Sequence, residues 1–197
     1  ETTTTANTLQ VLGDTSCVAA YTFEGNANDL DTSTPQNGTA TSVIYDYNGT
    51  ASSSVTYATG KFGKAAVFNG SSSEVTINNF ATLSQVGISM WVNIADVTSS
   101  YGLITKYASN DREFSIYNYQ ASNGFIAALY YNGNNSNSIT LTASDYLTNN
   151  TWHHIAYTAD GVNKPRLYID GVQTLETAQS NNNTYYSTSQ PISLGSF

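Results

Sequence analysis

The sequence has few charged residues, a single cysteine and no long apolar segment. Charged residues make up 10% of its 197 residues, and 6 Lys and Arg stand against 14 Asp and Glu, which gives a net charge of −8. Clustered cations are needed to bind a phosphate backbone, so we expect neither nucleic acid nor an anionic membrane surface as a partner. No apolar run approaches the roughly 20 residues that span a bilayer, so we expect no membrane insertion. The lone Cys17 cannot form an internal disulfide, and we interpret it as a small buried hydrophobic residue.

The abundant residues are those of strands and turns. The chain contains 27 Thr, 24 Ser, 22 Asn and 15 Tyr. Thr and Tyr favour the pleated surface of a strand, while Ser and Asn favour turns. No segment shows the apolar stripe of an amphipathic helix. The composition therefore predicts an all-β protein.

Short β segments alternate with turn signals from residue 17 onward, and residues 1–16 form a Thr-rich arm or linker. Asn-Gly and Asp-Gly pairs such as Asn69-Gly70 and Asp170-Gly171 mark tight turns. The expected strands are residues 18–23, 42–45, 54–57, 65–69, 74–77, 87–94, 103–106, 113–119, 124–131, 138–142, 152–160, 166–170, 172–177 and 192–194. Such a series is typical of a β-sandwich or barrel.

Alternation of apolar and polar residues assigns faces in two of these strands. One face is apolar, with Phe114, Ile116, Leu167 and Ile169, and the other carries Ser115, Tyr117, Tyr119, Arg166, Tyr168 and Asp170. A sheet face rich in tyrosine can bind a ligand, but tyrosine also covers ordinary sheets. Both interpretations stay open from the sequence.

Five segments in order resemble one known family. They are Ala20-Tyr21-Thr22-Phe23-Glu24-Gly25, Gly60-Lys61-Phe62-Gly63-Lys64, Ile88-Ser89-Met90-Trp91-Val92, Asn150-Thr151-Trp152-His153-His154 and Leu167-Tyr168-Ile169-Asp170-Gly171. Residues 17–197 thereby resemble a laminin-G-like domain of the concanavalin A-like lectin/glucanase superfamily. The resemblance implies a jelly-roll sandwich of two antiparallel sheets. The opening of the chain also resembles virion structural proteins of marine bacteriophages.

The end of the chain departs from this family. Family domains close with a further strand after the Ser-Leu-Gly segment, whereas this sequence stops at Phe197. A missing strand would leave backbone groups unpaired. We therefore expect either that the natural chain continues, or that residues 8–12 of the same or a neighbouring copy fill the place.

The sequence lacks the catalytic groups of the glycoside-cleaving relatives, and we predict that the protein is not an enzyme. Those enzymes need two carboxylates about 5 Å apart. Asp111 and Glu113 are the nearest candidates, and we interpret them as a hairpin end held by Arg112. His153 and His154 are adjacent, so they point to opposite faces of a strand and cannot jointly bind a metal. We expect a structural role for both.

A calcium site is the one cofactor site that the sequence suggests. Calcium prefers oxygen ligands from carboxylates, amides and backbone carbonyls. A short stretch offers such side chains, and they are Glu24, Asn26, Asp29 and Asp31. The alternative is an Asn/Asp-rich turn that is capped by its own side chains.

A carbohydrate site on such a fold would combine aromatic rings with amide groups. The candidates are Tyr107, Tyr117, Tyr119, Tyr130, Tyr131, Asn132 and Tyr185. For each tyrosine, plain coverage of a sheet is the alternative. We interpret Trp91 and Trp152 as core residues.

These observations predict a non-enzymatic module for adhesion, with carbohydrate as its ligand, located extracellularly or on a virion surface. The competing hypothesis is a structural subunit that assembles with copies of itself or with other virion proteins into a capsid, tail or filament and binds no free ligand. The Thr-rich arm and the missing strand favour that second hypothesis.

Overall fold

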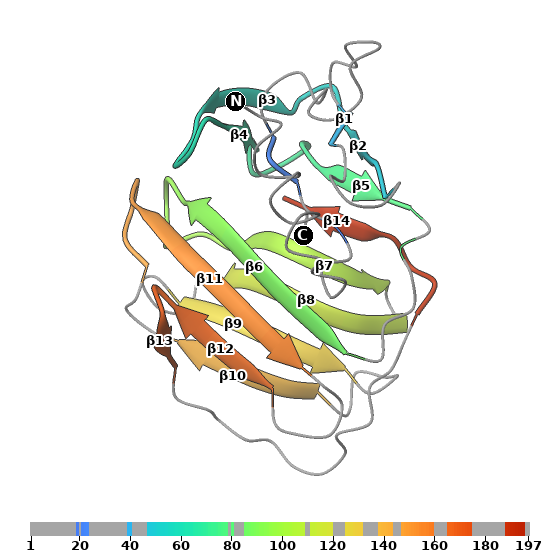
Figure 1. The fold of residues 1–197 in the computed structure, drawn as a ribbon, viewed down its shortest axis with the longest axis vertical. Coiled ribbons are helices and arrows are strands. Elements are labelled where there is room, and N and C mark those ends of the chain that lie inside the picture. The colour runs from blue at the N-terminus through green and yellow to red at the C-terminus, as the bar shows by residue number, and fades with distance from the viewer. Residues whose placement is uncertain are drawn as a thin grey trace, which may run out of the picture. The chain divides into compact units, whose positions relative to one another are not determined.

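The computed structural model describes residues 19, 21–23, 39–40, 47–78, 80, 85–108, 111–119, 125–131, 138–143, 147–159, 165–174 and 188–195. Every regular element in these ranges is a β-strand (Figure 1). None of the ranges contains a helix long and apolar enough to cross a membrane. The chain forms two compact units, Glu1–Asn79 and Phe80–Phe197, which are considered separately below.

The described residues of the first unit form five short strands. They are β1 (Thr39–Ala40), β2 (Gly49–Ala51), β3 (Thr56–Thr59), β4 (Lys64–Val67) and β5 (Val75–Ile77). Strand β2 pairs antiparallel with β1 on one side and β5 on the other, while β3 and β4 form a hairpin. Gly60 ends β3 where the backbone of β4 comes close: an added Cβ would lie 2.7 Å from the Lys64 carbonyl oxygen. Only glycine fits there without a backbone shift.

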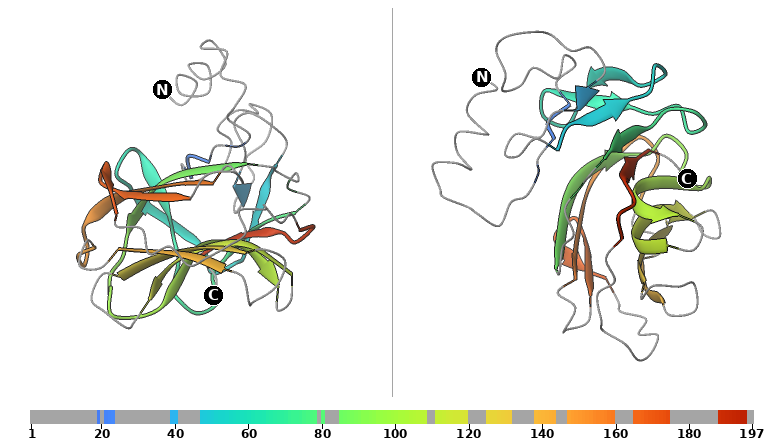
Figure 2. Two further views of the ribbon diagram at one scale, coloured as in Figure 1. Left: turned by 90° about the horizontal axis from the view of Figure 1, so that it is seen from below. Right: turned by 90° about the vertical axis from the view of Figure 1, so that its right-hand side faces the viewer.

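The second unit contains nine described strands in two antiparallel sheets. They are β6 (Val86–Asn93), β7 (Tyr101–Ala108), β8 (Asp111–Tyr119), β9 (Phe125–Tyr131), β10 (Ser138–Ala143), β11 (Trp152–Ala159), β12 (Arg166–Ile169), β13 (Val172–Gln173) and β14 (Ile192–Leu194). One sheet has the order β14-β7-β8-β9-β10 and the other β13-β12-β11-β6. Figure 2 shows these sheets as two layers. The predicted all-β, two-sheet architecture is confirmed.

The core of the second unit lies between the two sheets. Ile155 and Tyr157 of β11 are fully buried, as are Phe114 and Ile116 of β8. Burying one such side chain stabilises the fold by about 1.5–3 kcal/mol. The apolar positions that alternation predicted in β8 and β12 are therefore confirmed as core positions.

A tight turn joins β12 to β13 at the predicted Asp-Gly pair. Asp170 and Gly171 have φ angles of 50° and 81°, and Ile169 lies opposite Val172. A two-residue hairpin with positive φ at both positions matches the twist of the strands, and Asp-Gly tolerates that conformation. This turn fixes the position of Asp170 beside β11.

Most predicted strands of the second unit match the observed ones to within two residues, and the errors lie elsewhere. The strand predicted at 172–177 ends at Gln173. The strand predicted at 18–23 is absent where the structure describes it: residues 19 and 21–23 are irregular, and Phe23 has a φ of 56°. Strand β2 was missed because Gly-Thr-Ala carries no apolar alternation. The predicted strand 42–45, the arm 1–16 with its boundary at residue 17, Cys17 and the chain end at Phe197 lie outside the described residues.

Candidate functional site

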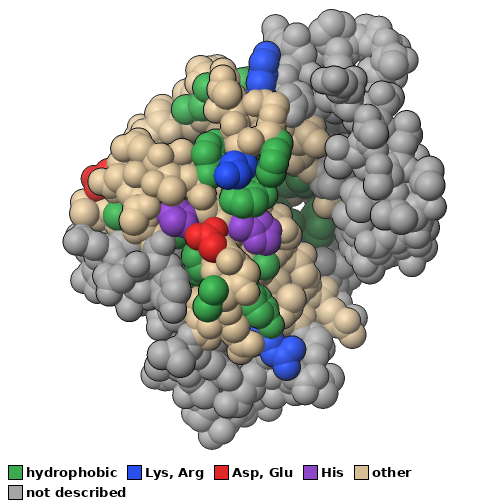
Figure 3. Space-filling view, turned by 60° about the vertical axis from the view of Figure 1, so that its left-hand side comes forward, with side chains coloured by type: hydrophobic (Ala, Val, Ile, Leu, Met, Phe, Trp, Pro, Cys, Tyr) green, Lys and Arg blue, Asp and Glu red, His purple; other side chains and the backbone are tan. Residues whose placement is uncertain are grey.

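The side of the four-stranded sheet that points away from the core carries aromatic and polar side chains. Exposure alternates along β6, β11 and β12, so that every second residue belongs to this side. We call it the outer face, and its residues are Gly87, Ser89, Trp91, Asn93, Trp152, His154, Ala156, Thr158, Arg166 and Tyr168. Figure 3 shows histidine and acidic side chains next to one another on the surface, with hydrophobic side chains around them.

Trp91 is a large aromatic side chain on β6, the strand at one edge of the described four-stranded sheet. It is 42% exposed, and its register partner on β11 is His154. The two ring centroids lie 5.2 Å apart with the planes tilted by 52°. This distance is typical of a packed aromatic pair. The indole thus packs against the imidazole and is also partly exposed to solvent.

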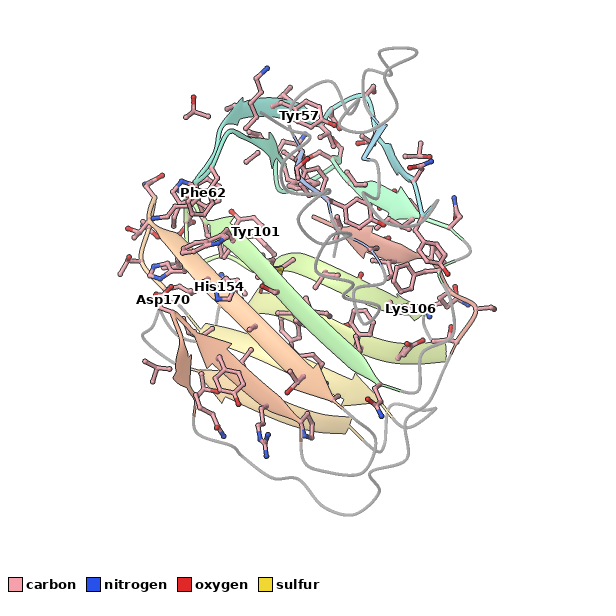
Figure 4. The ribbon with its side chains drawn as sticks, viewed as in Figure 1. Tyr57, Phe62, Tyr101, Lys106, His154 and Asp170 are labelled. Atoms are coloured by element: carbon pink, nitrogen blue, oxygen red, sulfur yellow. The ribbon has the colours of Figure 1, made fainter. Side chains whose placement is uncertain are left out.

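His154 also contacts the next exposed residue of β6. A hydrogen bond of 2.8 Å joins its Nε2 to the Ser89 hydroxyl (Figure 4 labels His154). The imidazole is therefore held between Trp91 and Ser89, which limits its rotation and that of the indole.

Asp170 anchors the two histidines from the β12–β13 turn. Its Oδ2 lies 2.7 Å from His153 Nδ1, and its Oδ1 accepts a hydrogen bond of 2.8 Å from the backbone N–H of His154. The backbone N–H of Thr148 donates to His153 Nε2 at 3.2 Å. Since Nε2 accepts, the neutral ring carries its proton on Nδ1 and donates it to Asp170. As predicted, the two histidines point to opposite faces of the strand: His153 is buried, and His154 belongs to the outer face.

These contacts lower the pKa of the Asp170 carboxyl. Partial desolvation by burial acts in the opposite direction, but the hydrogen bonds from the His153 side chain and the His154 backbone outweigh it. Hydrogen bonds to an ionised carboxylate favour the charged form. Asp170 is therefore ionised over the neutral pH range.

Ser89, His154 and Asp170 do not form a catalytic triad, although all three residue types are close. In a triad the carboxylate orients the same imidazole that contacts the serine. Here the Asp170 carboxylate binds the ring of His153, and it reaches His154 only at the backbone. The histidine that contacts Ser89 has no carboxylate behind its ring among the described residues.

Glu113, one of the two carboxylates that the sequence singled out, is engaged in the core. Its Oε2 lies 2.8 Å from Lys106 Nζ and accepts a hydrogen bond of 3.0 Å from the backbone N–H of Thr188. Lys106 Nζ also lies 5.9 Å from the centre of the Phe80 ring. A β-bulge explains the placement: Lys106 lies opposite Phe114 and Tyr107 opposite Arg112, so Glu113 has no partner in the register.

Glu113 is therefore held by Lys106, and no described contact supports the predicted role of Arg112 at a hairpin end. The side chains of Asp111 and Arg112 are outside the described part of the structure. No local feature of the sequence predicts the Lys106–Glu113 pair, because the bulge that creates it depends on how β7 and β8 align.

No three His, Cys, Asp or Glu side chains gather as metal ligands in the described ranges. Asp96, in the loop after β6, uses its carboxylate within its own turn. Hydrogen bonds from the Thr98 hydroxyl, the Thr98 backbone and the Ser99 hydroxyl lower the pKa of Asp96. The residues proposed for calcium, namely Glu24, Asn26, Asp29 and Asp31, lie outside the described residues, so that site stays a prediction.

The tyrosines proposed as sugar ligands belong to the other sheet. Tyr107 is in β7, Tyr117 and Tyr119 are in β8, and Tyr130 and Tyr131 are in β9. Only the side chain of Tyr117 is described, and it is half-buried. Tyr130 and Tyr131 occupy successive positions of a strand, and such positions belong to opposite faces of a sheet. Asn132 and Tyr185 lie outside the described residues, so convergence of this set stays untested.

The prediction that Trp91 is a core residue was wrong. Ile88, Met90 and Val92 occupy the inward positions of β6, which places Trp91 outward. Trp152 is half-buried and lies on the same outer face, opposite Asn93. The alternation of 88–92 was visible in the sequence, but the size and hydrophobicity of tryptophan outweighed it in the prediction.

Comparison with known proteins identifies related folds. The sequence model described as concanavalin A-like lectin/glucanases superfamily matches residues 69–196. The binding domain of Paraclostridial mosquitocidal protein 1 has 16% identity and a TM-score of 0.62 over 84% of this chain and 42% of its own. The ligand-binding domain of botulinum neurotoxin serotype D, solved in complex with N-acetylneuraminic acid, has 18% identity and a TM-score of 0.57 over 76% of this chain and 38% of its own.

The receptor-binding domain of botulinum neurotoxin type G is similar, with 16% identity and a TM-score of 0.55 over 76% of this chain and 38% of its own. This chain thus spans less than half the length of each of these three structures. At such identities the likeness shows the fold alone. Among curated protein sequences, none matches the chain.

Proposed function

Because the chain belongs to the concanavalin A-like lectin/glucanase superfamily, we propose that it is a non-catalytic carbohydrate-binding domain that acts outside the cell. The superfamily includes binding proteins and enzymes, so function has to be argued from the site. The observation that carries the proposal is Trp91, a large aromatic side chain that is 42% exposed beside hydrogen-bonding groups on a sheet face.

Such an arrangement suits a sugar. One face of a pyranose ring is apolar and stacks on an indole, while its hydroxyl groups need donors and acceptors at the edge. Ser89 and His154 supply those groups next to Trp91. A water-exposed indole also has an energetic reason to be covered, because burying apolar area contributes about 25 cal/mol per Å².

The contacts of the Glu113 carboxylate support the proposal that the protein is not a catalyst. Lys106 and Thr188 bind its carboxylate in the core, which leaves that group out of reach of a substrate. Ser89 and His154 lack the carboxylate that would orient a catalytic imidazole. For Glu113, or for Ser89 and His154, to act as catalytic groups, these contacts would have to rearrange.

The similar toxin domains suggest which sugars to test. One was solved with N-acetylneuraminic acid, but this chain matches only 38% of that domain, so sialylated glycans are one class among several. The reported structures are parts of toxins and lend no support to the resemblance to phage virion proteins. The alternative of an assembling subunit depends on the arm and the chain end, which the structure does not describe.

A glycan array with the whole chain tests this proposal directly. We expect saturable binding to one structurally related group of glycans, and unchanged mass of the bound glycans after long incubation. The absence of binding across a broad array would overturn the binding function. Shortened glycans after incubation would overturn its non-catalytic character.

A further inference from the structure

Besides Trp152 and His154, the outer face carries two aromatic side chains, Trp91 and Tyr168, on strands that are not neighbours. Trp91 lies on β6 and Tyr168 on β12, with Ala156 of β11 between β6 and β12. Tyr168 is half-buried, so part of its ring is accessible. Two strand spacings of about 4.8 Å and two residues of about 3.4 Å separate the two Cα atoms by roughly 12 Å. One sugar ring cannot contact both side chains, whereas a short oligosaccharide can.

The row of residues that leads from β6 across β11 to Tyr168 carries small side chains. Ser89 lies opposite Ala156, which in turn lies opposite Tyr168, so small side chains fill the row between the strands. A Cβ added to Gly87, one row further along, would have no atom within 4 Å. Apart from His154, which packs beside Trp91, no large described side chain of β6 or β11 lies between Trp91 and Tyr168.

The charges of this region favour an uncharged ligand. Arg166 is exposed at the start of β12, and no described carboxylate pairs with it. Asp170 at the other end of β12 is ionised, and its two carboxylate oxygens are engaged by the His153 ring and the His154 backbone. The whole chain carries a net charge of −8 and repels anions at long range. His154, the other titratable group on the face, is engaged with Ser89.

From these observations we propose that the outer face binds a neutral oligosaccharide, which stacks one sugar on Trp91 and extends across β11 to Tyr168 and Arg166. The inference rests on the proposed carbohydrate-binding function and adds to it the site and the ligand class. Trp91 holds the first sugar ring. Ser89, Thr158 and Arg166 lie along the path and supply hydrogen bonds to the hydroxyl groups.

Two substitutions of Trp91 separate ring stacking from general hydrophobicity. The probes are neutral hexasaccharides, namely cellohexaose, xylohexaose, maltohexaose and laminarihexaose, measured by calorimetry with the full chain. For the hexasaccharide that binds, Trp91→Leu weakens affinity roughly tenfold because the ring is lost. Trp91→Phe retains part of the affinity. Equal affinity of Trp91→Leu and the unchanged protein would overturn the site while leaving the binding function intact.

A matched control removes an exposed apolar side chain elsewhere on the same sheet. Val172 on β13 is 57% exposed, and its register partner Ile169 points into the core. We expect Val172→Ala to bind as the unchanged protein does. Thermal melting of each variant verifies that it is folded, since Trp91 and Val172 are both exposed and their replacement costs little stability. Loss of binding in Val172→Ala as large as in Trp91→Leu would contradict the assigned site.

The length and charge of the probe test the remaining parts of the inference. We expect the monosaccharide to bind far more weakly than the hexasaccharide, and Tyr168→Ala to weaken the hexasaccharide but not the monosaccharide. Affinity should be the same at low and high salt, because a neutral ligand feels no screening. Tighter binding of a sialylated trisaccharide, lost in Arg166→Gln, would overturn the neutral class. The absence of binding to every glycan would overturn the function and this site together.

Discussion

Two carboxylate side chains of the second unit each contact a nitrogen atom at nearly the same distance, but in different surroundings. Lys106 Nζ and Glu113 Oε2 lie 2.8 Å apart, with side chains that are 1% and 0% exposed. His153 Nδ1 and Asp170 Oδ2 lie 2.7 Å apart, with side chains that are 11% and 48% exposed. The first pair lies in the sheet formed by β7 and β8, and the second joins β11 to the turn after β12 (Figure 4).

The difference shows that burial, more than distance, determines what each pair does. Two buried charges lose their hydration, and their attraction compensates for that loss only while both are present. Thr188 and Phe80 contact the Lys106–Glu113 pair, and both charged side chains are buried away from solvent. The Asp170 side chain is 48% exposed, so its contact with His153 contributes less to stability than the buried pair does. It positions His153 behind the outer face and His154 on that face.

The largest effect is expected from breaking the buried pair. Lys106→Met leaves the Glu113 carboxylate in the core without its cation, which costs about 3–5 kcal/mol of unfolding free energy. Chemical denaturation measures it. The double variant Lys106→Met, Glu113→Leu removes both charges, and we expect it to recover most of the loss. A single variant as stable as the unchanged protein would contradict the importance of burial.

A smaller effect is expected at the exposed pair. Asp170→Ala removes the acceptor for His153 and for the His154 backbone and places alanine at a positive φ, so we expect a loss of about 2 kcal/mol. Asn tolerates this backbone conformation and retains an acceptor. Asp170→Asn should therefore cost about half as much. A loss from Asp170→Ala equal to that from Lys106→Met would erase the distinction between the two pairs.

A structural feature could be predicted from the sequence when it depends on residues that are close together in the chain. Alternation within a strand is local, and it correctly assigned Phe114, Ile116 and Leu167 to the core. The turn at Asp170 followed from the conformational preference of a dipeptide. The bulge at Glu113 and its pairing with Lys106 depend on how two strands align, and no local signal reports that.

The candidate site was less predictable than the fold. Trp91, Ser89 and His154 come from strands that are 65 residues apart in sequence at the Ser89–His154 contact, and only the pairing of β6 with β11 joins them. The prediction from the sequence favoured tyrosines in loops and on β7, β8 and β9. It overlooked Trp91 because a tryptophan is usually well buried.

Acid should affect the exposed pair in a defined pH range. The pKa of Asp170 is lowered in the folded state, so its contribution is complete above the ordinary carboxyl pKa of about 4 and is lost as pH falls below that value. The stability difference between the unchanged protein and Asp170→Asn, measured in urea, should therefore shrink between about pH 5 and pH 2. A difference that grows with acid would contradict the assigned direction.

The smallest effect on stability is expected on the outer face itself. Ser89→Ala removes an exposed hydroxyl, so we expect a change within about 0.5 kcal/mol. The hydrogen bond to His154 Nε2 disappears, and nuclear magnetic resonance of the imidazole should show a change in its tautomer balance or rotation. An unchanged imidazole spectrum would contradict the contact.

The most direct test of the account uses the fact that the chain contains two tryptophans. In Trp152→Phe, Trp91 is the only indole, and its fluorescence reports on the outer face alone. Titration with the neutral hexasaccharide that binds best should shift the emission to shorter wavelength and saturate at the affinity measured by calorimetry, because the sugar covers the ring. An emission spectrum that stays constant while calorimetry shows binding would place the sugar elsewhere and contradict the account.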